Sequence, residues 1–215
     1  MNVNLISYSQ GADGKNLLDQ VAYDARVSNP SNQNNPETSE KLVRYLIKHQ
    51  HWSPLEMVSV CLEIDTTRDI ARQILRHRSF AFQEFSQRYA DATQLGFETR
   101  EARLQDTKNR QNSIATDDVE LAEEWEAVQK LALGVIKYAY TWALENGIAK
   151  EQARAVLPEG ITKTRMYMNG TMRSWVHYIQ LRSANGTQKE HQEIAIACAK
   201  AIEPIFPMIM EFVNV

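Results

Sequence analysis

The 215-residue sequence contains few of the residues from which common catalytic and nucleotide-binding motifs are built. Its two cysteines, Cys61 and Cys198, lie within apolar patterns and lack metal-ligand spacing, which indicates buried thiols in a reducing cytoplasm. Neither has a polar, arginine-flanked setting that would lower the thiol pKa, so a thiolate nucleophile is not expected. No G-x-G-x-x-G, G-x-x-x-x-G-K-S/T or G-x-S-x-G motif occurs, so a nucleotide would not be held by a glycine-rich loop.

Long apolar runs and an excess of charge are also missing. No run of eighteen apolar residues occurs, which predicts no membrane span. The segment Met1 to Ile6 lacks the basic and then apolar order of a secretory signal. The net charge of −3 argues against nonspecific nucleic-acid binding. We therefore expect a soluble cytoplasmic protein with a single domain over residues 1–215.

The sequence does contain one local cluster of cations. Between Thr66 and Tyr89 there are five arginines and one histidine but only two acids, and no lysine occurs between Lys48 and Lys108. The guanidinium fork donates two parallel hydrogen bonds and suits phosphate or a planar heterocycle. Interleaved phenylalanines indicate a partly buried segment, where arginines need partners. A bound anion would supply them.

Apolar periodicity predicts a mixed α and β chain that is richer in helix. Strands are expected at residues 3–9, 57–65, 84–89 and 162–168, and helices at 15–26, 39–49, 68–76, 119–146, 149–157, 171–183 and 188–202, with a polar loop over 104–118. In the strand at 84–89, Glu84, Ser86 and Arg88 would share one face next to Arg76.

The helix expected at 171–183 carries polar residues on both flanks of its apolar stripe. Arg173 and His177 lie one turn apart on one flank, and Arg182 lies on the other. One small ligand could hardly reach both flanks. The pattern favours two ligands that meet across the helix, or a site shared between subunits.

Three other interpretations stay open from the residues alone. A metal site could use His49, His51 and Glu56. A magnesium-dependent nucleotide pyrophosphohydrolase could use Glu123, Glu124 and Glu126. A nucleic-acid-binding module could use the helix from Arg68 to Arg78, with a steep salt dependence.

The central stretch resembles the motif R-H-R-x-x-S-x-x-x-x-S-x-R of the flavin-dependent thymidylate synthases. It is present as Arg76-His77-Arg78, then Ala81 in place of serine, then Ser86 and Arg88. Further blocks follow in the family's order over about residues 20 to 200. They are Ala25-Arg26-Val27-Ser28, His51-Trp52-Ser53-Pro54-Leu55-Glu56, Ala153-Arg154-Ala155-Val156-Leu157-Pro158 and the stretch from Asn169 to Arg182.

The resemblance implies α+β (mixed α/β) subunits with a central, mostly antiparallel sheet flanked by helices, assembled as a homotetramer with active sites shared between subunits. It implies reductive methylation of dUMP to dTMP in de novo thymidylate biosynthesis. Methylenetetrahydrofolate would give the carbon, and tightly bound FAD, reduced by NADPH, would give the hydride. Neither an enzymic cysteine nucleophile, nor a metal, a nucleic acid or a membrane would take part.

The resemblance also implies roles for individual positions. The residues expected to contact dUMP are Gln73, Ile74, Leu75, Arg76, Glu84, Phe85, Ser86, Gln87, Arg88, Arg154 and Arg182. Those expected to contact FAD are Ser53, Arg76, His77, Arg78, Glu84, Thr171, Met172, Arg173 and His177. Ser28 and His51 are further candidates near the flavin and the folate or nicotinamide pocket.

Arg182 would be the catalytic residue. The family assigns to this position the guanidinium that stabilises the deprotonated uracil imide, so that carbon 5 becomes electron-rich. Three positions depart from the family pattern: Ala81 lacks the motif hydroxyl, Met57 replaces a histidine, and Thr171 replaces an asparagine. None of the three is an arginine assigned to the phosphate or the imide.

Overall fold

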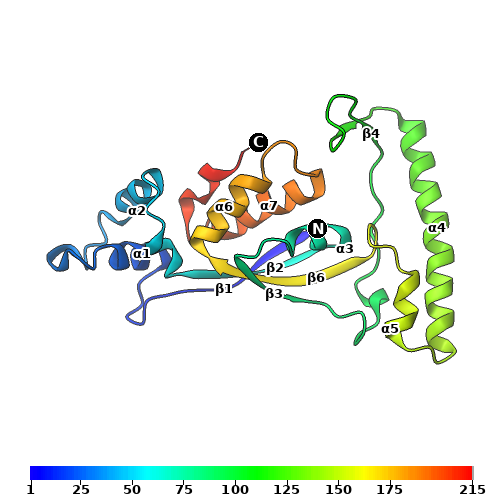
Figure 1. The fold of residues 1–215 in the computed structure, drawn as a ribbon, viewed down its shortest axis with the longest axis horizontal. Coiled ribbons are helices and arrows are strands. Elements are labelled where there is room, and N and C mark those ends of the chain that lie inside the picture. The colour runs from blue at the N-terminus through cyan, green and yellow to red at the C-terminus, as the bar shows by residue number, and fades with distance from the viewer. Residues whose placement is uncertain (215) are drawn as a thin grey trace. The chain divides into compact units, whose positions relative to one another are not determined.

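The structure, a computed structural model, describes residues 1–214 and has a four-stranded sheet with helices (Figure 1). The strand order is β1-β2-β6-β3. These strands are β1 Asn2–Tyr8, β2 Ser59–Thr67, β3 Phe80–Glu84 and β6 Lys163–Thr171, and a separate pair consists of β4 Arg103–Gln105 and β5 Ser113–Ala115. The helices are α1 Leu17–Ala25, α2 Ser39–Lys48, α3 Arg68–Ile74, α4 Val119–Glu145, α5 Lys150–Ala153, α6 Met172–Arg182 and α7 Lys189–Ile202. Short 3₁₀ turns cover Pro30–Asn32, Ser53–Glu56, Ala92–Gln94, Arg154–Val156 and Pro207–Phe212.

Hydrogen bonds at the two ends of β2 and β6 show that these neighbouring strands run in opposite directions. At one end of the β2–β6 pair the Met172 amide donates to the Val58 carbonyl, and at the other end the Arg68 amide donates to the Thr162 carbonyl. Residues with higher numbers in one strand thus face residues with lower numbers in the other, which defines an antiparallel pair. β4 and β5 are also antiparallel, with Leu104 opposite Ile114. The predicted mixed α/β fold with an antiparallel sheet is confirmed.

The chain divides into two compact units. Unit 1 consists of residues Met1–Ile64, His77–Gln83 and the chain from Tyr167 onward, and unit 2 consists of Asp65–Arg76 and Glu84–Met166. Strands β2 and β6 each contribute residues to both units. The single domain over residues 1–215 stays a prediction.

Unit 1 is built on the alternation that the sequence predicted for β2. Val60, Leu62 and Ile64 are fully buried while the residues between them are half-exposed, as a strand with one face on the core requires. On α6, Trp175 is fully buried, and its indole Nε1 donates to the Val60 carbonyl at 2.9 Å. Helix α7 packs against both α6 and β1 (Figure 1), so the two C-terminal helices form a layer with the sheet.

Unit 2 contains the long helix α4, which starts and stops where the sequence predicted. The Asp118 side chain caps it by accepting from the Leu121 amide at 3.0 Å, and Gly147 follows it with a φ of +76°, as a helix end favours. One side of α4 packs against α5, with Tyr140 fully buried. The opposite side exposes apolar side chains.

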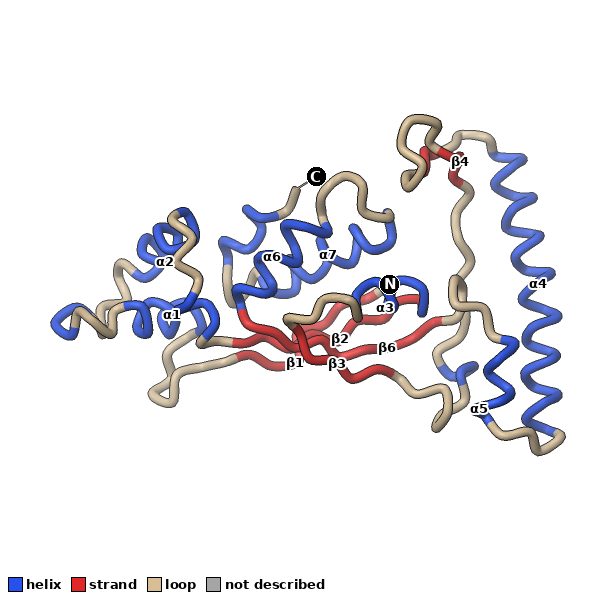
Figure 2. The backbone as a smooth tube through the Cα atoms, in the orientation of Figure 1, coloured by secondary structure: helices blue, strands red, loops and turns tan. Residues whose placement is uncertain are grey.

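The strand predicted at residues 84–89 is wrong. β3 begins at Phe80 and ends at Glu84, with alternating half-buried and exposed side chains, and then gives way to a loop (Figure 2). The strand follows the alternation of Phe80 and Phe82, so it begins and ends earlier in the chain than the alternating polar residues Glu84, Ser86 and Arg88 predict. Ser86 opens a turn instead, since its carbonyl accepts from the amides of Tyr89 and Ala90. Glu84, Ser86 and Arg88 therefore do not share a strand face.

Smaller differences concern helix faces, caps and thiols. Tyr45 of α2 is 52% exposed, because Val43 and Leu46 form the buried side. Thr67 precedes α3, but its hydroxyl donates to the Asp69 carboxylate instead of accepting from the helix. Cys61 is half-buried rather than buried. The loop expected over residues 104–118 contains most of the β4–β5 hairpin.

Candidate functional site

Most residues expected to contact dUMP lie in unit 2, at the end of α3 and after β3. Helix α3 ends at Ile74, which lies in the core with no exposed surface, and the Arg76 side chain, two residues further along, is exposed. Arg154 lies at the start of the 3₁₀ turn that follows α5 and is half-buried. The side chain of Ile74 thus packs in the core, and only the backbone of Ile74 could contact a ligand.

Glu84 is held by an ion-pair network that the sequence did not predict. Its Oε1 accepts from Arg68 Nη1 at 3.2 Å and from Thr164 Oγ1 at 2.9 Å. Arg68 is 6% exposed and also pairs with Glu159 at 3.3 Å, and Glu159 pairs with Arg72 at 3.1 Å. Burial raises the pKa of the Glu159 carboxyl, but the two arginines outweigh burial and lower it. The network fixes the position of the Glu84 carboxylate at the end of β3.

The turn after β3 borders a hollow of about 370 Å³. Its lining residues are Ser86, Arg88, Tyr89, Ala149, Lys150 and Glu151. Arg88 Nη2 pairs with Glu151 at 3.3 Å, and Lys150 Nζ donates to the Tyr89 carbonyl at 3.1 Å. Two cations and a hydroxyl thus surround one hollow, which is the donor set that a phosphate requires. Sequence reasoning found Ser86 and Arg88 but missed Lys150, which directly follows the predicted start of α5.

Gln87 differs from its neighbours in this turn. Its side chain is buried, at 5% exposure, and its Nε2 has no hydrogen-bond partner among residues 1–214. A buried amide that lacks a partner costs free energy. The turn thus carries a donor that a ligand or a solvent molecule could satisfy.

Most residues expected to contact FAD lie in unit 1, on α6 and the segments around it. Thr171 precedes α6 and caps it by accepting from the Ser174 amide at 3.3 Å. The Ser174 hydroxyl donates to the Ser79 carbonyl at 3.2 Å, which ties the segment after Arg78 to the first turn of α6. Met172 is fully buried, so its side chain packs in the core.

Gly170, just before this helix, permits a close ring contact. A Cβ at this position would lie 2.3 Å from Cδ1 of Phe80, a distance that no packed interior tolerates. The Phe80 ring instead packs over the glycine and meets Trp175 edge-on, with centroids 4.8 Å apart. This packing anchors the start of β3, directly after the Arg76–Arg78 segment.

The two flanks of α6 contact different segments of the chain, while the two ligands expected there stay a prediction. On one flank Arg173 pairs with Glu56 of the Ser53–Glu56 turn, and His177 packs on Trp52 with ring centroids 4.5 Å apart. Burial lowers the pKa of His177, and the charge of Arg173 adds to the effect. The His177 ring is therefore neutral at pH 7 and can donate or accept a hydrogen bond.

On the other flank Arg182 Nε donates to Nε2 of His77 at 2.9 Å. His77 was expected with FAD and Arg182 with dUMP, so this bond joins the two predicted sets directly. The two terminal nitrogens of Arg182 make no hydrogen bond to any of residues 1–214. They are the donors that Arg182 can offer to a ligand.

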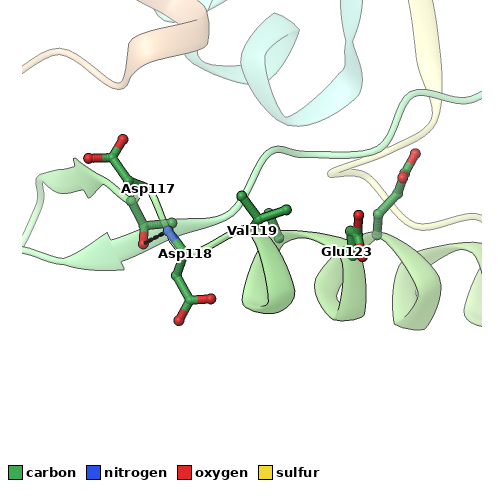
Figure 3. A pocket seen from close by; sticks show the side chains of 7 residues that line it. Asp117, Asp118, Val119 and Glu123 are labelled. Carbon is green, nitrogen blue, oxygen red and sulfur yellow. Dashed lines mark hydrogen bonds between the residues drawn. The ribbon is translucent and has the colours of Figure 1, made fainter.

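The acidic residues around the start of α4 do not form a metal centre. A hollow of about 380 Å³ is lined by Asp117, Asp118, Glu123 and Glu126 among others, but the carboxylates of Asp117 and Asp118 point in different directions (Figure 3). Across residues 1–214 no three His, Cys, Asp or Glu side chains are grouped to hold a metal ion. Neither Glu123, Glu124 and Glu126 nor His49, His51 and Glu56 form such a group. None of the helices in residues 1–214 could cross a membrane.

The fold and these contacts define a mixed α/β protein whose arginines, hydroxyls and neutral imidazoles suit anionic, planar ligands. The family model for thymidylate synthase complementing protein (Thy1) matches residues 4–208. Two relatives are a probable flavin-dependent thymidylate synthase of Paramecium bursaria Chlorella virus 1, 47% identical, and a flavin-dependent thymidylate synthase of Synechocystis sp., 48% identical; each alignment covers 97% of both chains. The chain belongs to this family, the flavin-dependent thymidylate synthases, as the motif around Arg76 predicted.

Solved structures agree with this assignment. The crystal structure of a UMP/dUMP methylase, PolB from Streptomyces cacaoi, bound with 5-Br dUMP is similar with a TM-score of 0.78 and 26% identity, over 98% of this chain and 93% of that chain. The same methylase bound with 5-Br UMP gives a TM-score of 0.79 and 25% identity, over 98% and 92%. The fold is thus one that occurs in pyrimidine nucleotide methylases.

Proposed function

We propose that this protein is an FAD-dependent thymidylate synthase, which methylates dUMP to dTMP with methylenetetrahydrofolate as the carbon donor and NADPH as the reductant. Relatives that share nearly half of its residues are named as a flavin-dependent and a probable flavin-dependent thymidylate synthase, and the structurally similar PolB is a UMP/dUMP methylase. The observation that carries the proposal is the hollow beside Ser86 and Arg88, with Lys150 as a further cation. A nucleotide monophosphate carries nearly two negative charges, which these groups can bind by charge-assisted hydrogen bonds.

The remaining groups of the dUMP set would hold the base and the sugar. These are Gln73, Leu75, Arg76, Glu84, Phe85, Gln87 and Arg154, with Ile74 through its backbone. Glu84 is held in place by Arg68 and Thr164. A fixed carboxylate accepts hydrogen bonds without reorganising as a ligand arrives.

Arg182 would stabilise the electron-rich uracil. Its Nε is engaged by His77, so the two terminal nitrogens would meet the imide and its carbonyl. A guanidinium beside the imide favours the deprotonated ring and raises electron density at carbon 5, which attacks the methylene group. Arg182 thus acts as the catalytic residue, while the phosphate contacts fix the orientation of the ring.

The residues around α6 fit a flavin dinucleotide. Arg78 and Arg173 provide cations for a pyrophosphate, Ser53 and Thr171 provide hydroxyls, and His77 and His177 provide planar donors. Arg76, Glu84 and Met172 complete the proposed set, and Ser28 and His51 would border the folate or nicotinamide side. Bound FAD supplies the hydride, and the protein aligns it with the uracil.

Neither cysteine is suited to act as a nucleophile. Cys198 is fully buried, and burial raises the pKa of its thiol. Burial also raises the pKa of the half-buried Cys61. Both therefore remain thiols at pH 7. This supports a mechanism in which Arg182, rather than a thiolate, activates the pyrimidine.

We further propose that residues 1–215 form one domain of a cytoplasmic homotetramer, with α4 in an interface between copies. Leu131, Val135 and Tyr138 are 73%, 64% and 71% exposed and lie on the side of α4 opposite the buried Tyr140. An exposed apolar patch of this kind marks a protein contact in soluble proteins.

A spectrum and an assay test the proposed function. The purified protein should show the visible absorbance of an oxidised flavin, and NADPH should bleach it. It should form dTMP from dUMP and methylenetetrahydrofolate. The Arg182→Ala variant should retain the flavin and lose activity by about a hundredfold or more. A colourless protein that takes up no FAD would contradict the proposal, as would turnover in Arg182→Ala equal to that of the wild type.

A further inference from the structure

A buried polar pair lies between α6 and α7. The Tyr178 hydroxyl and His191 Nε2 are 3.1 Å apart, and both side chains are buried, at 1% and 0% exposure. A buried polar group needs a partner, and core satisfaction alone would account for the pair. Its surroundings indicate more, because the pair directly contacts the imidazole that holds Arg182.

His77 lies between this pair and Arg182. Its ring meets the Tyr178 ring edge-on, with centroids 4.9 Å apart and an interplanar angle of 85°, and lies 6.3 Å from His191. Its Nε2 accepts from Arg182 Nε. The Tyr178 ring thus packs against the His77 imidazole, and a nitrogen of that imidazole accepts a hydrogen bond from the Arg182 guanidinium.

We propose that Tyr178 and His191 are positioning residues for Arg182: they fix the orientation of the His77 ring, so that its Nε2 accepts from Arg182 Nε and the terminal nitrogens point to the ligand. This inference rests on the proposed function of Arg182. The requirement is specific, because an imidazole accepts only through a nitrogen without a proton. A rotated ring, or the other tautomer, would present a donor to the Arg182 Nε–H.

The electrostatics of the pair suit this role. Burial lowers the pKa of His191 to about 3, and the charge of Arg182 adds to the effect. Burial raises the pKa of Tyr178 well above its ordinary value, with Cys198 adding to the rise. Both groups therefore stay neutral across physiological pH. Because neither changes its charge, the pair presents a constant surface to His77.

Deleting the hydroxyl tests this inference. In the FAD-loaded protein, Tyr178→Phe should lower kcat for dTMP by on the order of tenfold, with the KM for dUMP changed by less than about twofold. Combined with Arg182→Lys, which lacks the Nε donor, Tyr178→Phe should lower kcat by less than about twofold. His191→Gln keeps a group that can bond to the hydroxyl and should retain more activity than His191→Leu.

A second measurement does not depend on turnover. In protein with ¹⁵N-labelled histidine, NMR should show His77 Nε2 without a proton in the wild type and a mixture of tautomers in Tyr178→Phe. Tyr140→Phe is the matched control, because it removes another buried hydroxyl, one that accepts from the Ala92 amide, and should change neither kcat nor the His77 signal.

Two results would overturn the inference. One is an unchanged His77 tautomer in both Tyr178→Phe and His191→Leu. The other is an equal loss of kcat from Tyr178→Phe in the wild-type and the Arg182→Lys backgrounds, which would indicate a general structural role. Failure of the proposed function would look different: the wild type would form no dTMP, while the NMR comparison would still decide whether the pair holds the His77 ring in place.

Discussion

Asp65 of β2 and Arg165 of β6 form a bidentate ion pair, with Nε to Oδ1 at 2.7 Å and Nη2 to Oδ2 at 2.8 Å. The hydrogen bonds from Arg165 lower the pKa of the Asp65 carboxyl against the opposing effect of burial. A carboxyl whose pKa is lower in the folded state stabilises the fold above its unfolded pKa, about 4, and loses that contribution as the pH falls through the folded value.

Asp65→Asn should therefore destabilise the protein in a pH-dependent manner. At pH 7 the free energy of unfolding should fall by about 1 kcal/mol, because the pair is partly exposed to solvent. The difference from the wild type should shrink as the pH falls below about 4, where the wild-type carboxyl also becomes protonated. Urea unfolding at several pH values measures this, and a difference that grows at low pH would contradict the assignment.

Gly170→Ala should destabilise unit 1. The new Cβ would lie 2.3 Å from the Phe80 ring, and the ring cannot move without losing its contact with Trp175. We expect a loss of about 1–3 kcal/mol in the free energy of unfolding, as for other overpacked cores. Gly160→Ala is the control, since a Cβ at that position would meet no atom within 4 Å. Equal effects of the two substitutions would show that the Phe80 contact is not the cause.

Gln50→Gly should have the opposite effect. Gln50 joins α2 to the following turn with a φ of +58°, where residues other than glycine are strained. Glycine relieves the strain but adds freedom to the unfolded chain, so we expect a net gain of about 0.5–1 kcal/mol. Thermal unfolding of the variant measures the gain. Gln50→Ala, which keeps a Cβ, should show none.

Arg88→Ala should weaken dUMP binding more than it weakens the fold. Its ion pair with Glu151 is mostly exposed, and such pairs contribute about 0–1 kcal/mol to stability. A charge-assisted bond to a phosphate is stronger, so we expect the Kd for dUMP to rise about tenfold or more, with a smaller rise for Lys150→Ala. Arg44→Ala, on α2, removes a cation outside the hollow and is the control. Calorimetry can measure all three.

What the sequence could predict depended on how far apart the interacting residues lie. The alternation from Val58 to Ile64 and the helical spacing of Trp175, Val176 and Ile179 are local patterns, and both elements were predicted correctly. The placement of Arg173 and Arg182 on the two flanks of α6 follows from the same spacing, and in the structure the two arginines contact different segments. Local periodicity was sufficient for these features.

Partners that lie far apart in sequence could not be predicted in this way. Glu159 is 91 residues from Arg68 and 87 from Arg72, and no local pattern links them. The strand misplaced onto residues 84–89 has a related cause. The alternating polar residues from Glu84 to Arg88 resemble the pattern of a strand. The position of β3, by contrast, depends on contacts with β6, such as that between Glu84 and Thr164, which lie 80 residues apart in the sequence.

The exposed side of α4 leads to a prediction about assembly. Leu131 lies at the centre of this side and is 73% exposed. If copies meet here, Leu131→Glu would bury a charge without a partner, and the cost of several kcal/mol would shift the assembly to smaller species. The chain itself should stay folded, because Leu131 is not part of the core. Lys130→Gln alters the charge by the same amount beside the apolar stripe and should leave the assembly intact. Sedimentation of both variants tests this, and an unchanged mass for Leu131→Glu would place the interface elsewhere.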